Sequence, residues 1–410
     1  ALSDRDVSLI SQIVYGVTTW KLTLDEIIKK YSSIKLKKIS IWIINILRMG
    51  IYQIIFLDKI PKSAAVNECV NLAKRYGHKA SSGFVNAILR KVSPDDYLQL
   101  FDVKLPKAEM ISKTQSMPLW IIEELLENNT IEEVEEICKN LNLTPCVSIR
   151  VNNVKTTKKE LEEIFNKNSI QYEEGELDDF LILNKAKNIE NIEGFKEGLF
   201  TVQDESAGLT CLVLNPKEGQ MVLDACSAPG GKTTYMAEIM KNTGNIIAWD
   251  VYEHRINLIN ENANRLGLKN INTSINDASI YNENYKEKFD KILLDVPCLG
   301  IGVIRRKPDI KWQRKQEDVY EISKLQYKIL ETCSKYLKPG GELVYSTCSI
   351  LKKENEDVIL KFLENNKDFE IKKLDSNKWN EYIKEEKYFS IKPDKKHDGF
   401  FICKLHKNNI

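Results

Sequence analysis

The sequence lacks any cysteine pattern that would bind a metal or build a disulfide framework. Its nine cysteines, at positions 69, 138, 146, 211, 226, 298, 333, 348 and 403, include no CxxC pair and no cluster with histidine at zinc-site spacing. An odd, scattered set without a signal peptide is typical of proteins kept in a reducing compartment. We therefore expect a cytoplasmic protein that holds no metal.

The sequence also lacks a long uninterrupted hydrophobic run. The most apolar stretch extends from Ile39 to Leu57, but Arg48 lies in its middle, and Asn45 and Gln53 dilute it. Because a central arginine is costly in lipid, a buried helix pair explains this stretch better than a membrane span does. We expect no membrane association.

Neither sign of charge predominates in the whole chain, since the formal net charge is only +1. The distribution is nevertheless uneven, because residues 1–92 hold 15 Lys and Arg against 6 Asp and Glu. A basic amino-terminal part in a nearly neutral chain indicates an acidic partner such as RNA. A lysine-rich surface that faces only water gives the same count, so charge alone leaves the two interpretations open. Internal repeats and low-complexity segments are absent from the sequence.

What is present indicates a chain of several domains, because 410 residues exceed what one core usually supports. Apolar residues recur at helical spacing through residues 1–93, which predicts an all-α domain. The stretches SPDD and KLPK, between residues 93 and 107, are linker signals. Residues 108–200 are expected to form a small α+β domain. Its predicted elements are helices at 118–141 and 158–165 and strands at 147–151 and 180–183.

The third predicted domain, residues 201–410, alternates strands with helices. This alternation is typical of a doubly wound, Rossmann-like parallel α/β sheet. The predicted strands are 221–225, 245–249, 271–275, 291–295 and 342–346, with tail strands at 369–374 and 399–405. The predicted helices are 232–241, 253–266, 317–336 and 353–365.

Such sheets bind ligands beyond the carboxyl ends of their strands. The first turn, DACSAPGGKTT at 224–234, fits neither the phosphate-loop pattern nor GxGxxG, and a tight packing turn remains an alternative. Asp250, Asp277 and Asp295 each follow a further strand; singly, each also suits a helix cap. Together with the turn they indicate a nucleoside with a charged amino-acid tail, S-adenosylmethionine. The candidate cofactor residues are Cys226, Ser227, Ala228, Pro229, Gly230, Gly231, Lys232, Asp250, Asp277 and Asp295.

Two motifs carry a resemblance to a known family. DVPCLGIGVIRRKPDIKW at 295–312 and YSTCSI at 345–350 resemble the paired signatures of RNA cytosine-C5 methyltransferases, and DACSAPGGKTT resembles their cofactor loop. IVYGV and FVNAILRKV resemble the NusB-like domain of the bacterial RsmB (Sun/Fmu) branch of the NOL1/NOP2/Sun family. PLWIIEELLE at 118–127, VSIRVNN at 147–153 and GLFTVQDESA at 198–207 match its middle region and the start of its catalytic domain.

The resemblance implies a multidomain fold: an all-α NusB-like RNA-binding domain, a small α+β RNA-binding domain and a Rossmann-like class I methyltransferase domain. It implies S-adenosylmethionine as cofactor and 16S ribosomal RNA as partner. The family usually has more residues before the NusB-like helices, so the first helix of that domain is expected to be missing. Met117 stands where the family often has His. Nothing in the sequence indicates an oligomer, and we expect a monomer.

The resemblance also assigns roles to two cysteines. Cytosine C5 is a poor nucleophile until a thiolate adds at C6, which splits a hard step into easier ones. The family assigns that thiolate to Cys348, with Cys298 assisting proton removal and release. It assigns Asp295 to the N3 and amino edge of the base, protonated when needed, and Lys232 to placing that carboxyl group. DNA cytosine methyltransferases use the PC cysteine instead, so the motif alone leaves the choice open, and either thiol alone suits a packed strand end.

The other expectations concern cysteines and cations. A helix beginning near Lys353 would lower the pKa of the Cys348 thiol, Cys226 would line the cofactor loop, and the remaining cysteines would lie in the core. Arg305, Arg306, Lys307, Pro308 and Asp309 would hold phosphates beside a flipped base, with Trp312 packing nearby, unless they form a salt-bridged surface loop. Further candidates for RNA contact are Arg48, Lys74, Arg75, Lys79, Arg90 and Lys91.

Two other functions remain open at this point. One is an RNA-binding, antitermination-like factor with an inactive methyltransferase scaffold, which the NusB-like start permits. The other is a cytosine-C5 methyltransferase that acts on another RNA, such as transfer RNA. Labelled methyl transfer to RNA separates the first from an enzyme.

Overall fold

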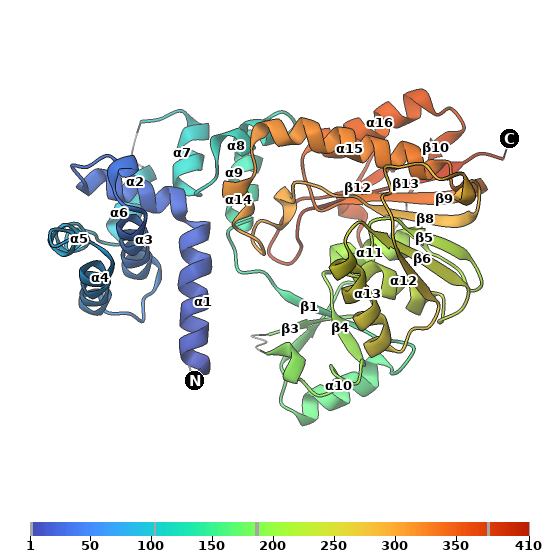
Figure 1. The fold of residues 1–410 in the computed structure, drawn as a ribbon, viewed down its shortest axis with the longest axis horizontal. Coiled ribbons are helices and arrows are strands. Elements are labelled where there is room, and N and C mark those ends of the chain that lie inside the picture. The colour runs from blue at the N-terminus through green and yellow to red at the C-terminus, as the bar shows by residue number, and fades with distance from the viewer. Residues whose placement is uncertain (1–2, 102–103, 185–187, 375–377, 410) are drawn as a thin grey trace. The chain divides into compact units, whose positions relative to one another are not determined.

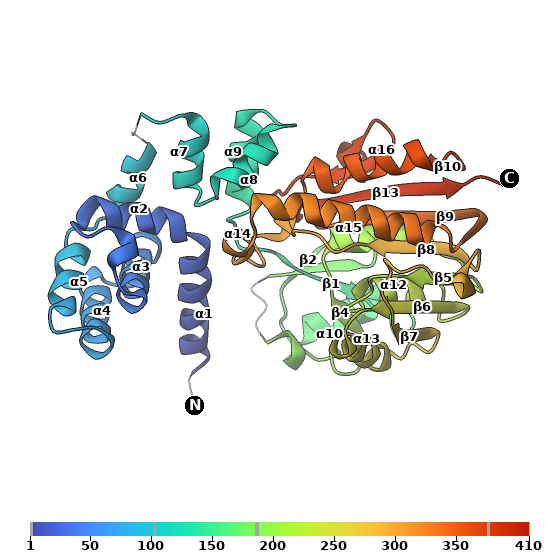
Figure 2. The ribbon, with the colours of Figure 1, turned by 45° about the horizontal axis from the view of Figure 1, so that its top comes forward.

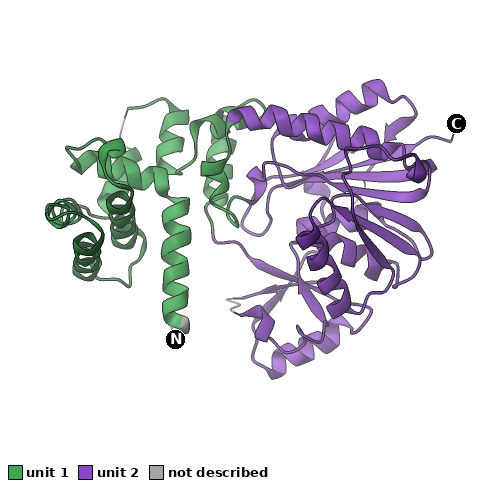
Figure 3. Cartoon of the chain, in the orientation of Figure 1, with its two compact units in different colours: residues 1–143, 304–315 green, residues 144–303, 316–410 purple. Residues whose placement is uncertain are grey.

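The computed structural model describes residues 3–101, 104–184, 188–374 and 378–409. The chain divides into two compact units, of residues 1–143 with 304–315 and of residues 144–303 with 316–410 (Figure 3). The short segment 304–315 therefore folds with the first unit, although its neighbours on both sides in the sequence fold with the second.

The first unit is helical throughout its described residues (Figure 1). Its α-helices are α1 (Asp4–Thr19), α2 (Lys21–Tyr31), α3 (Ile41–Phe56), α4 (Lys62–Tyr76), α5 (Ser81–Leu89), α6 (Asp95–Leu98), α7 (Lys107–Thr114), α8 (Leu119–Leu126), α9 (Ile131–Asn140) and α14 (Ile310–Gln313). Short 3-10 turns occupy Leu36–Lys38 and Gln99–Phe101. Buried aliphatic side chains such as Leu47 and Leu89 join α2 to α5 in one core.

The apolar stretch forms one helix, α3, and the predicted helix pair is wrong. Its arginine is accommodated by pairing, because Arg48 donates through Nε and Nη2 to the two carboxylate oxygens of Asp25 at 2.7 and 2.8 Å. Arg48 is 8% exposed and therefore does not offer its charge to RNA, contrary to expectation. Among the described residues, no helix is long and apolar enough to cross a membrane.

The second unit begins with a small antiparallel sheet in the order β2-β3-β1-β4, with helix α10 beside it. The elements are β1 (Val147–Val151), α10 (Lys158–Lys167), β2 (Tyr172–Glu174), β3 (Phe180–Leu183) and β4 (Phe200–Val202), with a 3-10 turn at Ile189–Asn191. Helix α10 begins with a capping box in which Thr157 and Glu160 satisfy each other's backbone N–H. The predicted strands 147–151 and 180–183 are confirmed.

The large sheet has the order β11-β12-β13-β9-β8-β5-β6-β7, and β10 pairs with β13. The strands are β5 (Met221–Asp224), β6 (Asn245–Asp250), β7 (Ile271–Ile275), β8 (Phe289–Asp295), β9 (Leu337–Thr347), β10 (Phe369–Ile371), β11 (Ile383–Lys384), β12 (Tyr388–Ile391) and β13 (Phe400–Lys407). Strands β5 to β9 run parallel, as predicted, whereas β10 to β13 form an antiparallel end. Of the four tail strands, only β10 and β13 were expected.

Helices cover both faces of this sheet (Figure 2). They are α11 (Glu205–Leu214), α12 (Gly231–Ile239) and α13 (Glu253–Leu266) on one face, and α15 (Gln316–Ser334) and α16 (Glu356–Asn365) on the other. Short 3-10 turns lie at Glu283–Tyr285, Ile301–Val303, Lys352–Glu354 and Asn380–Tyr382. The helix expected from residue 353 thus begins at Glu356, after a 3-10 turn, so it is farther from Cys348 than predicted.

Candidate active site

The loop between β5 and α12 is shaped to bring backbone close to a ligand. Ser227 donates through both its backbone N–H and its hydroxyl to the carbonyl of Trp249, at 2.9 and 2.8 Å, and this fixes the loop against β6. Gly230 has φ +99°, and a Cβ there would lie 3.2 Å from the Cα of Ile259, so glycine is required on both counts. Helix α12 begins at the next residue, and its free N–H groups face the loop.

The acidic residues lie along one edge of the sheet, because β8, β5, β6 and β7 are parallel neighbours. Asp250 accepts the backbone N–H of Tyr252 at 3.2 Å, and Asp277 accepts that of Ser279 at 2.8 Å. Each carboxylate therefore uses one oxygen in a local turn. The second oxygen of Asp277 has no partner in the described part of the chain, so it can accept from a ligand.

Lys232, on the first turn of α12, forms an ion pair with Asp295 at the end of β8. The Nζ–Oδ2 distance is 2.6 Å, and the hydroxyl of Ser346 donates to Oδ1 at 3.0 Å. Burial acts to lower the pKa of Lys232, but the Asp295 carboxylate outweighs it, so that pKa lies above its usual value. The ammonium group also lies 5.2 Å from the ring centroid of Phe400.

The two motif cysteines meet at this edge. The Sγ atoms of Cys298 and Cys348 are 2.9 Å apart, although 50 positions separate them in the sequence. The pKa of the Cys298 thiol lies well above its usual value, first because of its hydrogen bond with Cys348, then because of burial and nearby negative charge. Either sulfur can be the donor in this contact, and the raised pKa favours the protonated form of Cys298.

Two buried contacts fix the loops that carry these cysteines. Gly302 donates its backbone N–H to the carbonyl of Cys348 at 3.0 Å and accepts that of Gly399 at 2.9 Å. Glu354 is fully buried and accepts the backbone N–H of Leu299 at 2.9 Å, the amide of Gln326 at 3.0 Å and the hydroxyl of Ser349. Its carboxylate thus joins the segment after Cys298 to the segment after Cys348.

A pocket of about 190 Å³ lies between the cofactor loop and the Lys232–Asp295 pair. Gln203 lines it, is buried, and has an amide nitrogen with no partner among the described atoms. A buried unsatisfied donor is costly, so Gln203 is suited to an acceptor atom of a ligand. The loop backbone and this amide line the same pocket and fit the polar part of a nucleoside with an amino-acid tail.

Sequence analysis missed Gln203, Glu354 and Arg150. Arg150, on β1, is fully buried and donates to both carboxylate oxygens of Glu238, at 3.0 and 2.7 Å. It also donates to the carbonyl of Gly231 at 3.0 Å, so it supports the start of α12. The motif VSIRVNN marked this strand, but no local signal shows that its arginine is buried.

Several cation and cysteine expectations need correction. Arg305 is 6% exposed, so its guanidinium is not held out for a phosphate. Lys311, from the same segment, is 1% exposed and donates to the carbonyls of Thr19 and Ser116, both at 3.1 Å, and to Asn142. Trp312 donates to the carbonyl of Thr18 at 2.7 Å, so it packs within the helical unit. Cys146 is half-buried, not in the core.

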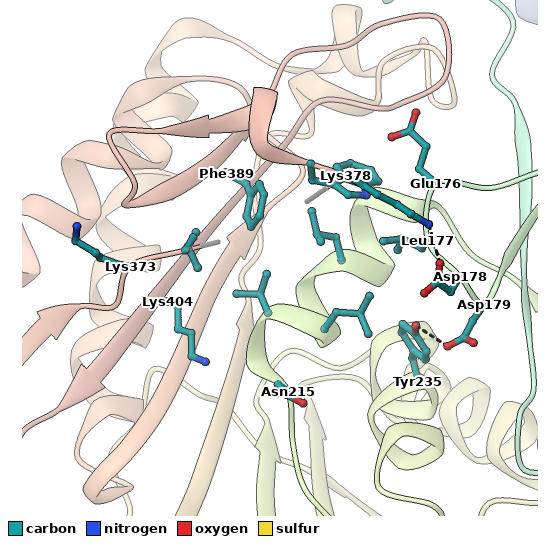
Figure 4. Close-up of a pocket in the computed structure, with 15 residues that line it drawn as sticks. Glu176, Leu177, Asp178, Asp179, Asn215, Tyr235, Lys373, Lys378, Phe389 and Lys404 are labelled. Carbon is teal, nitrogen blue, oxygen red and sulfur yellow. Dashed lines mark hydrogen bonds and ion pairs between the residues drawn. The ribbon is translucent and has the colours of Figure 1, made fainter. Parts of the chain in front are cut away.

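A second, larger pocket of about 600 Å³ lies away from these residues (Figure 4). Its walls include the Lys378–Asp178 ion pair and Tyr235, whose hydroxyl donates to Asp179. Neither of the two pockets is lined by a motif cysteine, but the smaller one is lined by the cofactor loop, Lys232 and Asp295, and the larger one by none of these, so size alone does not identify the active site. The smaller pocket, which contains the Lys232–Asp295 pair, is the candidate.

Comparison with known proteins agrees with this geometry. Residues 211–406 match the family described as 16S rRNA methyltransferase RsmB/F, residues 1–94 the NusB family, and residues 117–190 the RsmF/B-like ferredoxin-like domain. The probable ribosomal RNA small subunit methyltransferase B of Bacillus subtilis is 36% identical over 99% of this chain and 92% of its own. The ribosomal RNA small subunit methyltransferase B of Proteus mirabilis is 33% identical over 90% of this chain and 85% of its own.

Solved structures give the same result. The crystal structure of PH0851 has a TM-score of 0.82 and 28% identity, covering 99% of this chain and 91% of that one. A methyltransferase homologue from Pyrococcus horikoshii has a TM-score of 0.65 and 31% identity, covering 74% of this chain and 99% of that one.

Fold and site thus define a Rossmann-like, S-adenosylmethionine-dependent methyltransferase. The chain belongs to the RsmB/F family of ribosomal RNA small subunit methyltransferases. The predicted family, fold class and cofactor are confirmed, and RNA is the substrate class of the family.

Proposed function

We propose that the protein methylates C5 of a cytosine in 16S ribosomal RNA through a covalent bond between Cys348 and C6 of the base. The observation that carries the proposal is the 2.9 Å approach of Cys298 and Cys348 beside the Lys232–Asp295 pair. Covalent catalysis needs a thiolate, an assisting group and a proton source near N3, and these four side chains supply them. S-adenosylmethionine supplies the methyl group as a sulfonium.

The raised pKa of Cys298 supports Cys348 as the nucleophile. A thiol that keeps its proton cannot itself attack, but its S–H stabilises a thiolate on the neighbouring sulfur. When Cys348 adds to C6, N3 takes a proton that the Lys232–Asp295 pair holds. The raised pKa of Lys232 keeps the proton on its ammonium group before the reaction, where it donates to Asp295.

The second half of the reaction is assigned to Cys298. Once Cys348 is bonded to C6, it no longer accepts from Cys298 and no longer carries charge. Two causes of the raised Cys298 pKa then disappear, and only burial and the other charges remain. Cys298, which is only partly buried, can then release its proton to solvent. After C5 has taken the methyl group, the Cys298 thiolate takes the proton from C5. The C6–sulfur bond then breaks with release of the Cys348 thiolate, while N3 returns its proton to the Lys232–Asp295 pair.

The proposal also assigns a role to each domain of the chain. We assign residues 1–93 to the NusB-like RNA-binding domain, residues 108–200 to a second RNA-binding domain, and residues 201–410 to the catalytic domain. The compact units differ from these bounds, because residues 108–143 and 304–315 fold with residues 1–93. We assign the cofactor to residues 226–232 with Asp250, Asp277 and Asp295. The enzyme acts as a monomer in the cytoplasm.

The test uses 16S RNA fragments that contain 5-fluorocytosine, with S-adenosylmethionine present. Fluorine at C5 blocks loss of the C5 substituent, so the nucleophilic cysteine stays attached to the RNA on a denaturing gel. We expect the adduct to be lost in Cys348→Ala and kept in Cys298→Ala. Cys146→Ala, a half-buried cysteine elsewhere, is the matched control and should keep full adduct.

Two outcomes would overturn the proposal. Loss of the adduct only in Cys298→Ala would make Cys298 the nucleophile and Cys348 the assisting group. The site would then resemble that of DNA cytosine methyltransferases. Absence of both adduct and labelled methyl transfer with any RNA, from correctly folded protein, removes the enzymatic function and favours an RNA-binding factor.

A further inference from the structure

Two aromatic side chains of the helical unit are stacked on each other in solvent. Trp42, on the first turn of α3, and Tyr76, the last residue of α4, have ring centroids 5.2 Å apart and an interplanar angle of 17°. Trp42 is 59% exposed and Tyr76 is 43% exposed. The chain has six tryptophans, all within the described residues, and Trp42 is the only one classed as exposed. Since large aromatic residues are usually buried, the exposed faces of this pair are a candidate contact site for another molecule.

The segments that carry the pair contain no acidic residue. Residues 27–57 and 69–94 include no Asp or Glu, but they include eleven Lys and Arg. Six of these cations are exposed, lie next to the pair in the sequence, and have no ion-pair partner among the described residues: Lys35, Lys37, Lys38, Lys74, Arg75 and Lys79. The guanidinium of Arg75 lies 5.3 Å from the ring of Tyr76. The surroundings are therefore complementary to phosphate.

Another exposed aromatic residue shows that an exposed ring does not always have sequence neighbours that are free of acidic residues. Tyr320, on α15, is 62% exposed and has the ammonium of Lys324 3.9 Å from its ring. Its sequence neighbours, however, include Glu317, Asp318 and Glu321. Negative charge at that position repels a nucleic acid, so Tyr320 is a solvent-facing aromatic without the phosphate-binding surroundings.

We propose that Trp42 and Tyr76 form a stacking platform for an unpaired base of RNA, with the six cations holding the phosphates on either side. Bases stack on exposed aromatic rings only when they are unstacked from their own helix, so the ligand is single-stranded RNA rather than a duplex. The inference rests on the proposed function for its RNA substrate.

The experiment measures binding of the full chain to two labelled RNAs without cofactor: a short unstructured oligouridylate and a blunt-ended RNA duplex of similar length. Stacking on an aromatic contributes about 1–3 kcal/mol per base, so Trp42→Ala should weaken oligouridylate binding roughly five- to 150-fold. Trp42→Phe keeps a stacking face and should restore most of the affinity. The affinity for the duplex should be unchanged in both variants, and Tyr320→Ala should leave the binding of both RNAs unaffected.

Salt dependence separates the cations from the rings. Replacing Lys37 and Lys38 by Ala should reduce the slope of log affinity against log salt by roughly 0.7 per lost phosphate contact, whereas Trp42→Ala should leave the slope unchanged. Circular dichroism of each variant checks folding, which an exposed side chain should not disturb.

Three results would overturn the platform. The first is unchanged oligouridylate binding in Trp42→Ala, and the second is an equal loss of affinity for the duplex. The third is unchanged RNA binding with conversion of a dimer to a monomer in light scattering, which would assign the rings to a second copy of the chain. Failure of the proposed function shows separately, because binding needs no methyl transfer. If the protein shows Trp42-dependent RNA binding but no methyl transfer, that result refutes only the proposed reaction.

Discussion

The buried arginine on β1 gives the sharpest test of what holds the cofactor loop in place. Arg150 and Glu238 have side-chain exposures of 0% and 2%, and their closest N–O distance is 2.7 Å. The same guanidinium donates to the carbonyl of Gly231, to the hydroxyl of Thr234 at 3.1 Å, and to Gln203. We predict that Arg150→Met destabilises the contact between β1 and α12 and raises KM for S-adenosylmethionine.

The magnitude follows from the charge that the substitution leaves behind. Removing one partner of a buried ion pair costs about 3–5 kcal/mol, because the other charge stays buried without compensation. Burial already raises the pKa of Glu238, and Arg150 is the main opposing influence. A second substitution, Glu238→Leu, removes the stranded charge, and a buried pair replaced by apolar residues is often close to neutral. The double variant should therefore recover most of the loss.

Amide hydrogen exchange is the suitable assay, since a chain of several domains has no single unfolding free energy. In Arg150→Met, the opening constant of amides in β1 and α12 should rise roughly a hundred- to several-thousand-fold. The difference in exchange between variant and wild type should shrink as the pH falls. Without Arg150, Glu238 takes up a proton at a higher pH and so loses its charge. Lys373→Met removes an exposed ion pair with Glu386 and should change nothing.

The reasoning fails if Arg150→Met leaves exchange in β1 and α12 at the wild-type rate, or if the double variant is no better than the single one. The first result would mean that the pair contributes nothing net. The second would mean that the lost hydrogen bonds to the α12 backbone, and not the stranded charge, dominate.

Two further predictions concern buried carboxylates. Glu354→Ala removes the acceptor of three donors at about 1–3 kcal/mol each, so it should lower the thermal midpoint and reduce kcat more than KM. Glu364→Ala, at an exposed position of α16, should do neither, and equal effects of the two substitutions would contradict a role of Glu354 in holding the cysteine loops. Burial raises the pKa of Asp224 to about 7, so the folded state keeps a proton that the unfolded state has lost, and stability falls as the pH rises from about 4 to about 7. Asp224→Asn should therefore gain stability over wild type at about pH 8 but not at about pH 5, as measured by thermal unfolding, and a gain that is the same at both pH values would refute the assignment.

The spacing of apolar residues was enough to predict helices and strands that are buried through their own apolar side chains. The strand Phe180–Leu183 agrees with its predicted bounds because a run of four apolar residues is long enough for a buried strand but too short for a helix. Helix α13 likewise agrees, since its apolar residues recur at helical spacing and Gly267 ends it with φ +76°. The parallel order of β5 to β9 followed from the alternation of strands and helices.

Elements that depend on distant partners were not predictable. Strands β11 and β12 are short and mixed in polarity, and only pairing with β13 makes them strands. Arg150 meets Glu238 88 positions away, and Glu354 is one glutamate among several near residue 354. A sequence shows the residue type of a buried charge but not the partner that makes its burial possible.

The antiparallel end of the sheet also determines the geometry of the two cysteines. Gly399, just before β13, packs so closely on Gly302 that a Cβ on it would lie 2.8 Å from the Gly302 Cα, and a Cβ on Gly302 would clash with the Gly399 carbonyl. Gly302 in turn donates to the Cys348 carbonyl. The loops that carry Cys298 and Cys348 are therefore positioned by backbone contacts that do not involve either sulfur. Replacing one cysteine should leave the other in place, so an adduct formed or lost in a single-cysteine variant reports on chemistry rather than on collapse of the site.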